Sequence, residues 1–206
     1  MLVHHHLGLG DHIICNGLVR KLFAQTSDIT LVTKNKNLIN VKRMFKDIDI
    51  AYKPIENDVN IQGTLGWCFG GDRSIDFDQS FYKQAGVSFS ARWDSFYIER
   101  DYKQEKAISD YLELPNRFAL VNDEASAGKA GVNIQTDLPK VHLRRLPVEK
   151  SMFDWMGVIE RATEIHCINS SLVHLVDSMW PMAKLFYYND RPQLPFTRRL
   201  EWILCQ

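Results

Sequence analysis

The chain has 206 residues, 45% of them hydrophobic, and its 25 basic and 25 acidic residues give a formal net charge of zero. This composition fits one large core or two small domains and disfavours a general nucleic-acid binder, which normally carries a basic excess. No apolar run approaches the roughly 20 residues of a membrane span and no signal peptide is recognisable, so we expect a cytoplasmic protein without a membrane span.

The N-terminal half alternates predicted strands and helices. Apolar and β-branched runs predict strands at 2–7, 28–33, 48–52 and 66–69, and helical spacing of apolar residues predicts helices at 11–24, 38–45 and 78–86. The order strand, helix, strand, helix, strand predicts a parallel sheet with right-handed crossovers.

The C-terminal half repeats this alternation without an obvious sequence repeat. Strands are expected at 118–121, 141–146, 164–168 and 184–188, and helices at 103–112, 152–163, 172–179 and 196–205. We therefore predict an α/β protein of two small Rossmann-like, doubly wound lobes, residues 1–104 and 105–206. Ligands would bind at the carboxyl ends of the strands.

The four cysteines, at 15, 68, 167 and 205, are scattered and form no C-x-x-C pair. Cys15 and Cys167 lie in apolar segments, which predicts that they are small core residues. A reducing, cytoplasmic setting is the default for such a pattern.

The first candidate site is the loop LGLGDH, residues 7–12, after the first predicted strand. Gly8 and Gly10 allow a sharp turn and a close approach to a ligand, which would face the N-terminus of the next helix. Position 13 is Ile where the dinucleotide-binding pattern has its third glycine, and this disfavours a hydride-transfer enzyme. Asp11 suits either a helix cap or a catalytic carboxylate, and both interpretations stay open.

The second candidate site is the turn Asn169-Ser170-Ser171, which follows a predicted strand and begins a predicted helix. Hydroxyl groups and helix N–H groups together suit a diphosphate. His174 lies three residues after Ser171, close to one helical turn further on. A serine cap beside a packed histidine is the alternative, but the similar turn in the first half favours the functional interpretation.

Two other patterns suggest metal only weakly. The run His4-His5-His6 has no neighbouring carboxylates or cysteines, so a histidine such as His6 pointing into a cleft is the better interpretation. Asp76 and Asp78 form a D-x-D pattern directly before a predicted helix, where capping is the stronger explanation. We therefore expect no bound metal.

An aromatic and charged segment follows, with Arg92, Trp93, Asp94, Phe96 and Tyr97. Arginine and aromatic side chains suit phosphate and sugar recognition, so a polar substrate cleft is one interpretation. An ion-pair surface between domains is the other, and both stay open.

The two glycine- and serine-containing turns together resemble those of the ADP-heptose:lipopolysaccharide heptosyltransferase family, whose fold is the two-lobed GT-B type. LGLGDHIICNGLV, residues 7–19, is similar to that family's first strand–loop–helix with its Gly-Asp pair. EIHCINSSLVHLVD, residues 164–177, is similar to its donor motif, Asp-Ser/Thr-Gly-x-x-His before an apolar helix. Here Asn169 stands in place of the Asp and Ser171 in place of the Gly.

The resemblance implies an inverting, metal-independent transfer of a sugar from a nucleotide-diphosphate donor to an acceptor hydroxyl, with no resident cofactor. It implies Asp11 as the general base. The acceptor would be a glycan or another hydroxyl compound. The donor side would be held by Asn169, Ser170, Ser171 and His174, and the acceptor cleft would be lined by Gly8, Gly10, His6, His12, Asn16, Arg92 and Asp94.

Two alternatives remain for the function. One is a nucleotide-sugar epimerase or hydrolase of the same fold. The other is a non-catalytic nucleotide- or glycan-binding module, which the short lobes and the altered donor turn would suit. A metal-dependent enzyme that uses the D-x-D pattern is a weaker option.

Overall fold

The computed structural model describes residues 1–5, 8–56, 65–66, 76–125, 128–189 and 196–205. The chain divides into two compact units. Unit 1 comprises Met1–Glu99 and Leu194–Thr197, and unit 2 comprises Arg100–Gln193 and Arg198–Gln206.

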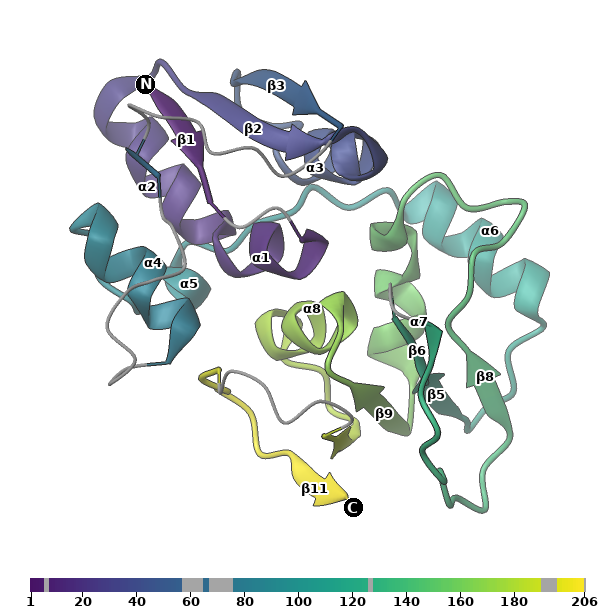
Figure 1. Ribbon diagram of the computed structural model, residues 1–206. Helices are drawn as coiled ribbons and strands as arrows, with labels where there is room; N and C mark the ends of the chain where they lie inside the picture. The colour runs from purple at the N-terminus through teal and green to yellow at the C-terminus, as the bar shows by residue number, and fades with distance from the viewer. Residues whose placement is uncertain (6–7, 57–64, 67–75, 126–127, 190–195, 206) are drawn as a thin grey trace. The chain divides into compact units, whose positions relative to one another are not determined.

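Unit 1 is built on a parallel sheet in the order β3-β2-β1-β4, of which Figure 1 labels β1, β2 and β3. This is the order of the first four strands of a Rossmann fold. Val3, Leu31 and Val32 are completely buried, as expected for a parallel sheet covered by helices. Its strands are β1 (Leu2–His4), β2 (Thr30–Lys34), β3 (Ala51–Ile55) and β4 (Leu65–Gly66), and its helices are α1 (Leu9–Ile14), α2 (Asn16–Thr26), a 3₁₀ turn (Asn35–Asn37), α3 (Leu38–Met44), α4 (Phe77–Ala85) and α5 (Ala91–Asp94).

Two of the differences between unit 1 and the prediction have a physical reason in the described contacts. The helix expected over 11–24 is interrupted at Cys15, where the hydroxyl of Tyr82 donates to the carbonyl of Ile14 at 2.7 Å and so satisfies a group at the break. The third strand continues through Pro54 instead of stopping before it. Proline is tolerated there because β3 is the last strand in the sheet order, so its missing N–H costs no ladder bond on the outer side.

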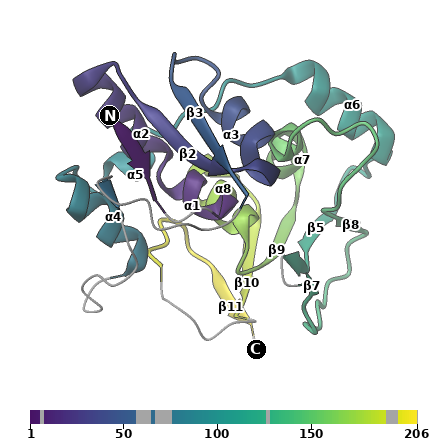
Figure 2. The same cartoon turned by 45° about the horizontal axis from the view of Figure 1, so that its top comes forward.

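Unit 2 contains a five-stranded parallel sheet in the order β11-β10-β9-β5-β8, and Figure 2 shows β9, β10 and β11 side by side. Numbered within the unit, this order is 2-1-3-4-5, the flavodoxin-like order. Its strands are β5 (Ala119–Asn122), β8 (Lys140–His142), β9 (Glu164–Ile168), β10 (Lys184–Tyr188) and β11 (Ile203–Cys205), with a small antiparallel pair, β6 (Glu124–Ala125) and β7 (Gly128–Lys129). Its helices are α6 (Tyr102–Leu112), a 3₁₀ turn (Met152–Trp155), α7 (Met156–Arg161) and α8 (Ser171–Met179).

The helix predicted over 196–205 is wrong. Its described residues contain no helix, and Ile203–Cys205 form the strand β11 beside β10. The reason is the buried carboxylate of Asp177 on α8, which accepts the backbone N–H groups of Arg199 and Leu200 at 3.0–3.1 Å. It also accepts the indole N–H of Trp202 at 3.3 Å. These bonds hold the segment extended, which local sequence cannot reveal.

The expected α/β class with parallel sheets is confirmed, and the two sheets are consistent with Rossmann-like lobes. Cys15 and Cys167 are buried free thiols, as predicted, whereas Cys68 lies outside the described residues. Within the part of the chain that the structure describes, no helix is long and apolar enough to cross a membrane.

The contact between α2 and α5 depends on a glycine. A Cβ atom added at Gly17 would lie 1.8 Å from the carbonyl oxygen of Ala91, which is backbone and cannot rotate away. We expect Gly17→Ala to cost about 1–3 kcal/mol or more and to lower the Tm of the protein in thermal unfolding. Gly131→Ala is the matched control, because a Cβ there meets nothing within 4 Å. Equal Tm values for the two variants would contradict this close packing.

Candidate functional site

The strand order of unit 2 reverses at β5. The chain leaves β5 toward β8 on one side and returns to β9 on the other, so a crevice is expected outside the carboxyl ends of β5 and β9. Asn122 ends β5, and Asn169 and Ser170 follow β9. Figure 1 shows β9 leading directly into α8. Residues 48 positions apart in the sequence are thus brought to one edge of the sheet.

Ser170 is the N-cap of α8. Its hydroxyl oxygen accepts the N–H of Leu172 at 3.3 Å, and its single proton is donated to the side-chain oxygen of Asn122. The side-chain amide of Asn122 in turn donates to the carbonyl of Glu124 at 2.9 Å. Because a serine has one proton, Ser170 acts here as a cap and as a link to β5. Its predicted contact with a diphosphate would require this bond to break.

Ser171 is the first residue of α8 and is partly exposed. Its hydroxyl makes no hydrogen bond to another described residue. The first N–H groups of a helix also lack partners within that helix, and the positive end of its dipole lies at the same place. Ser171 is therefore the hydroxyl best placed to meet an anion at this turn.

His174 is only 5% exposed. Residues three and four apart share one face of a helix, and helical side chains lean toward the N-terminus. His174 therefore lies on the same face of α8 as Ser170 and Ser171, and its side chain is buried. Asn169, which replaces the Asp of the family motif, is half-buried at the end of β9.

Three residues at this edge were given no role by sequence reasoning. The carboxylate of Asp123 lies 3.4 Å from the ammonium of Lys129 and 3.6 Å from the ring nitrogen of His142. Asp123 directly follows β5, and His142 ends β8, the neighbouring strand. The available signal was their position, since polar residues that follow a buried strand gather at the carboxyl edge of a parallel sheet.

In unit 1, α1 begins with Gly8 as its N-cap and Asp11 at its third position. The Asp11 carboxylate accepts the backbone N–H of Gly8 at 3.1 Å. Asp11 therefore caps α1, and it does so from the third helical position by bonding the N-cap residue. A Cβ at Gly8 would lie 2.5 Å from that oxygen, which explains a glycine there. Gly10 lies inside α1, and His6 lies outside the described residues.

His12 and Asn16 lie in the interior of unit 1. A ring nitrogen of His12 is 3.1 Å from the hydroxyl of Thr33, and its ring centroid is 4.3 Å from that of His5. Burial and then the nearby His5 hold the pKa of His12 well below its ordinary value. Asn16 exchanges two hydrogen bonds with the backbone of Tyr97, at 3.0 and 3.1 Å. This burial disfavours the expectation that His12 and Asn16 line a cleft.

Arg92 is completely buried and pairs with the carboxylate of Asp78. It also donates to the carbonyl of Thr197 at 2.9 Å. Burial raises the pKa of Asp78 to about 6, although Arg92 and two backbone N–H groups oppose this rise. Asp94, in contrast, is exposed and borders a hollow of about 320 Å³ with Lys21. Arg92 and Asp94 therefore do not face one common cleft.

The carboxylates of the D-x-D pair, Asp76 and Asp78, form bonds to other residues of unit 1. Asp76 is the N-cap of α4, as predicted, but its carboxylate accepts the hydroxyl of Thr197 at 2.9 Å instead of a helix N–H. Asp78 is occupied by Arg92 and by the backbone N–H of Thr197 at 3.0 Å. Across the described ranges, no group of three or more His, Cys, Asp or Glu side chains could hold a metal ion.

Comparison with protein-family models, with curated proteins and with solved structures finds no match to this chain.

The buried His12 makes unit 1 sensitive to acid. Below about pH 6.5 a histidine in the unfolded chain binds a proton. In the folded unit His12 stays neutral at the same pH, because its pKa is lowered. The free energy of unfolding should therefore fall by about 1.4 kcal/mol per pH unit below that point. Asp78, whose pKa is raised, adds to the free energy of unfolding as the pH falls below about 6. This contribution is the same in the wild type and in a variant of His12.

Urea unfolding of the wild type and of His12→Phe over this pH range isolates the contribution of His12. We expect the variant to lose less stability on acidification than the wild type does. Parallel pH profiles for the two proteins would show that His12 takes up its proton equally well in the folded and unfolded states.

Proposed function

We propose that the protein is a GT-B-type glycosyltransferase, inverting and metal-independent, that moves a sugar from a nucleoside diphosphate to an acceptor hydroxyl. The observation that carries the proposal is the turn of Ser170 and Ser171, which begins α8 at the point where the strand order of unit 2 reverses. In open α/β sheets this is the place where nucleotides bind.

The chemistry of this turn suits a diphosphate. The Ser171 hydroxyl and the N–H groups of the first turn of α8 would donate to phosphate oxygens, and the helix dipole adds partial positive charge. Such fixed donors stabilise the negative charge that develops on a leaving nucleoside diphosphate. Lys129 lies at the same edge of the sheet, where its charge is paired with that of Asp123. The nucleotide sugar is thus a co-substrate, and no resident cofactor is proposed.

The proposed general base is Asp11 in unit 1. A carboxylate offers about four acceptor positions on two oxygens, so the bond from the N–H of Gly8 does not exhaust it. Asp11 is partly exposed, which a base acting on an acceptor hydroxyl requires. Capping and catalysis are therefore compatible in this residue.

A non-catalytic nucleotide-binding module is the second candidate. The specific observation that favours it is the bond from Ser170 to Asn122, which occupies a hydroxyl that the family motif would use for the donor. Binding of a nucleotide sugar without turnover on any acceptor would support this candidate. Conversion of the nucleotide sugar alone would instead indicate an epimerase or hydrolase.

Donor binding tests the role of Ser171. Nucleoside diphosphates should raise the Tm of the wild type, since a ligand at 100 times its Kd adds about 2.7 kcal/mol of stability. We expect Ser171→Ala to weaken binding about tenfold, because it removes a hydrogen bond to a charged group. Ser178→Ala is the matched control, as its hydroxyl donates to the carbonyl of His174 near the other end of α8. Equal weakening by both variants would contradict a specific role for Ser171.

Asp11→Asn tests the general base separately from the cap. An asparagine oxygen can still accept the N–H of Gly8, so the fold and the Tm should be retained. Asparagine cannot take up the acceptor proton, so the rate of sugar transfer should fall by about 10²–10⁴-fold while donor binding is unchanged. Release of nucleoside diphosphate is the measurement. Full turnover by Asp11→Asn would remove Asp11 from the mechanism.

A further inference from the structure

The loop between α8 and β10 in unit 2 presents an unusual residue. Trp180 ends α8 in the left-handed conformation, with φ 57° and ψ 55°, where glycine is the favoured residue. Its side chain is nevertheless 55% exposed. A bulky residue that holds a strained conformation without being buried points to a role for the indole at the surface.

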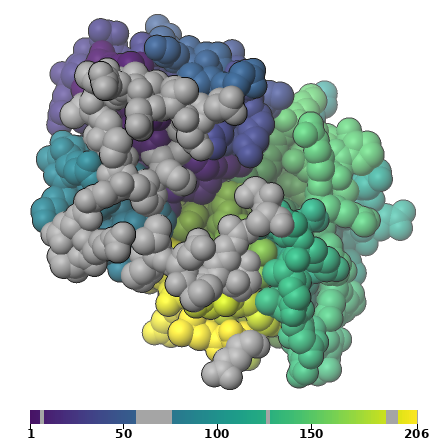
Figure 3. Space-filling model, viewed as in Figure 1, coloured from purple at the N-terminus to yellow at the C-terminus, as the bar shows by residue number. Residues whose placement is uncertain are grey.

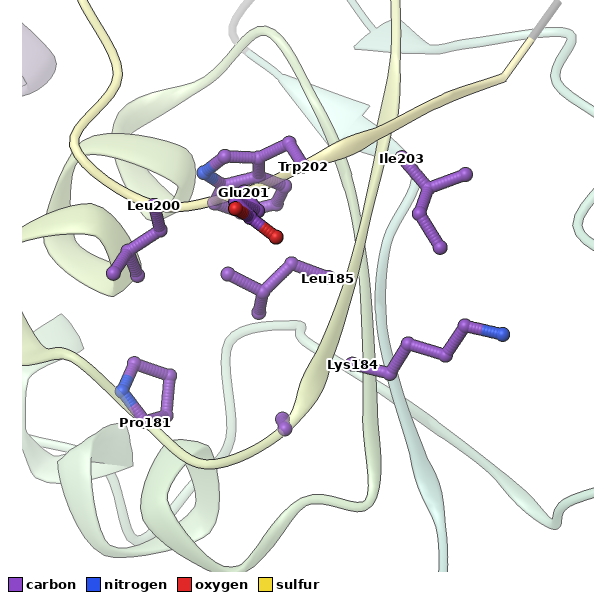
Figure 4. A pocket seen from close by; sticks show the side chains of 8 residues that line it. Pro181, Lys184, Leu185, Leu200, Glu201, Trp202 and Ile203 are labelled. Atoms are coloured by element: carbon purple, nitrogen blue, oxygen red, sulfur yellow. The ribbon is translucent and has the colours of Figure 1, made fainter.

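The exposed apolar surface continues from Trp180 along the chain. After Pro181 comes Met182, which is 96% exposed and so projects from the loop with almost no contact to the protein. The loop borders a hollow of about 470 Å³, which is lined by apolar residues such as Leu185 and Trp202 and by the charged Lys184 and Glu201, as Figure 4 shows. Figure 3 shows the nearby C-terminal segment, in yellow, at the molecular surface.

The described residues of the two chain segments that border this loop carry more positive than negative charge. Residues 180–189 and 198–205 contain three basic residues, Lys184, Arg198 and Arg199, and one acidic residue, Glu201. Their net charge is +2, in a chain whose formal net charge is zero. The guanidinium carbon of Arg199 lies 4.3 Å from the centroid of the Trp180 ring, which places a cation directly on the exposed indole.

We propose that the loop Trp180–Met182 docks unit 2 on an anionic lipid bilayer. The projecting Met182 side chain would enter the acyl boundary, and the indole of Trp180 would lie at the headgroup level, where aromatic rings with a polar edge are favoured. Arg198 and Arg199 would meet lipid phosphates, whereas Lys184 lies opposite Glu164 on β9. A projecting apolar side chain among cations suits insertion into such a surface, and this inference does not depend on the proposed sugar transfer.

Co-sedimentation of the purified full chain with vesicles tests the proposal. We expect binding to vesicles of equimolar phosphatidylcholine and phosphatidylglycerol, and much weaker binding to phosphatidylcholine alone. The double variant Trp180→Gly, Met182→Gln should lower the bound fraction, with a partition coefficient reduced about tenfold or more. Glycine relieves the left-handed backbone at position 180, so the Tm of this variant should show that the fold is retained.

Tyr102→Ala is the matched control. Tyr102 is an aromatic residue of unit 2 that is 71% exposed, and Arg100 lies 5.2 Å from its ring centroid. The guanidinium of Arg100 is, however, bound to Glu105 and Glu160. This variant should bind anionic vesicles as the wild type does. The proposal is overturned if the wild type stays in solution with both kinds of vesicle, if the double variant binds as well as the wild type, or if Tyr102→Ala weakens binding equally.

Discussion

The candidate donor site depends on one hydrogen bond between neighbouring strand ends, from the hydroxyl of Ser170 to the side chain of Asn122. It joins the turn after β9 to the last residue of β5, on the two sides of the point where the strand order reverses. Through Glu124 the same asparagine also fixes the start of the small β6–β7 pair. The start of α8 is therefore held in place before any ligand arrives, which lowers the ordering cost of binding.

The two units use a similar strand–turn–helix differently. In unit 1 the carboxylate of Asp11 accepts the N–H of Gly8 within the same turn. The helix that follows, α1, is only six residues long. In unit 2 the nine-residue α8 is preceded by a capping serine, Ser170, and begins with a second serine, Ser171. Unit 1 thus offers a carboxylate at its turn, whereas unit 2 offers hydroxyl and helix N–H groups, which suit an anion. This difference supports the division of roles in the proposed transferase.

Local sequence signals predicted the elements that carry these turns. The strand β9 was predicted with its observed bounds and α8 to within one residue, because an apolar run, a serine cap and an amphipathic helix follow one another there. What local signals could not predict were contacts between distant residues. The segment predicted as a helix over 196–205 is extended and ends in a strand, because Asp177 binds its backbone N–H groups. Arg92 is buried because it pairs with Asp78, whereas Asp94 is exposed. No local signal indicated the role of Asn122, because its partner Ser170 lies 48 residues away.

The most direct test of this account is to locate a bound nucleoside diphosphate by NMR on the isotope-labelled protein. The account predicts that the amide signals of Ser171 and Leu172 and the side-chain amide of Asn122 shift on titration, because these groups surround the start of α8. Shifts confined to the hollow beside Lys184 and Trp202, or no shifts at all, would contradict it.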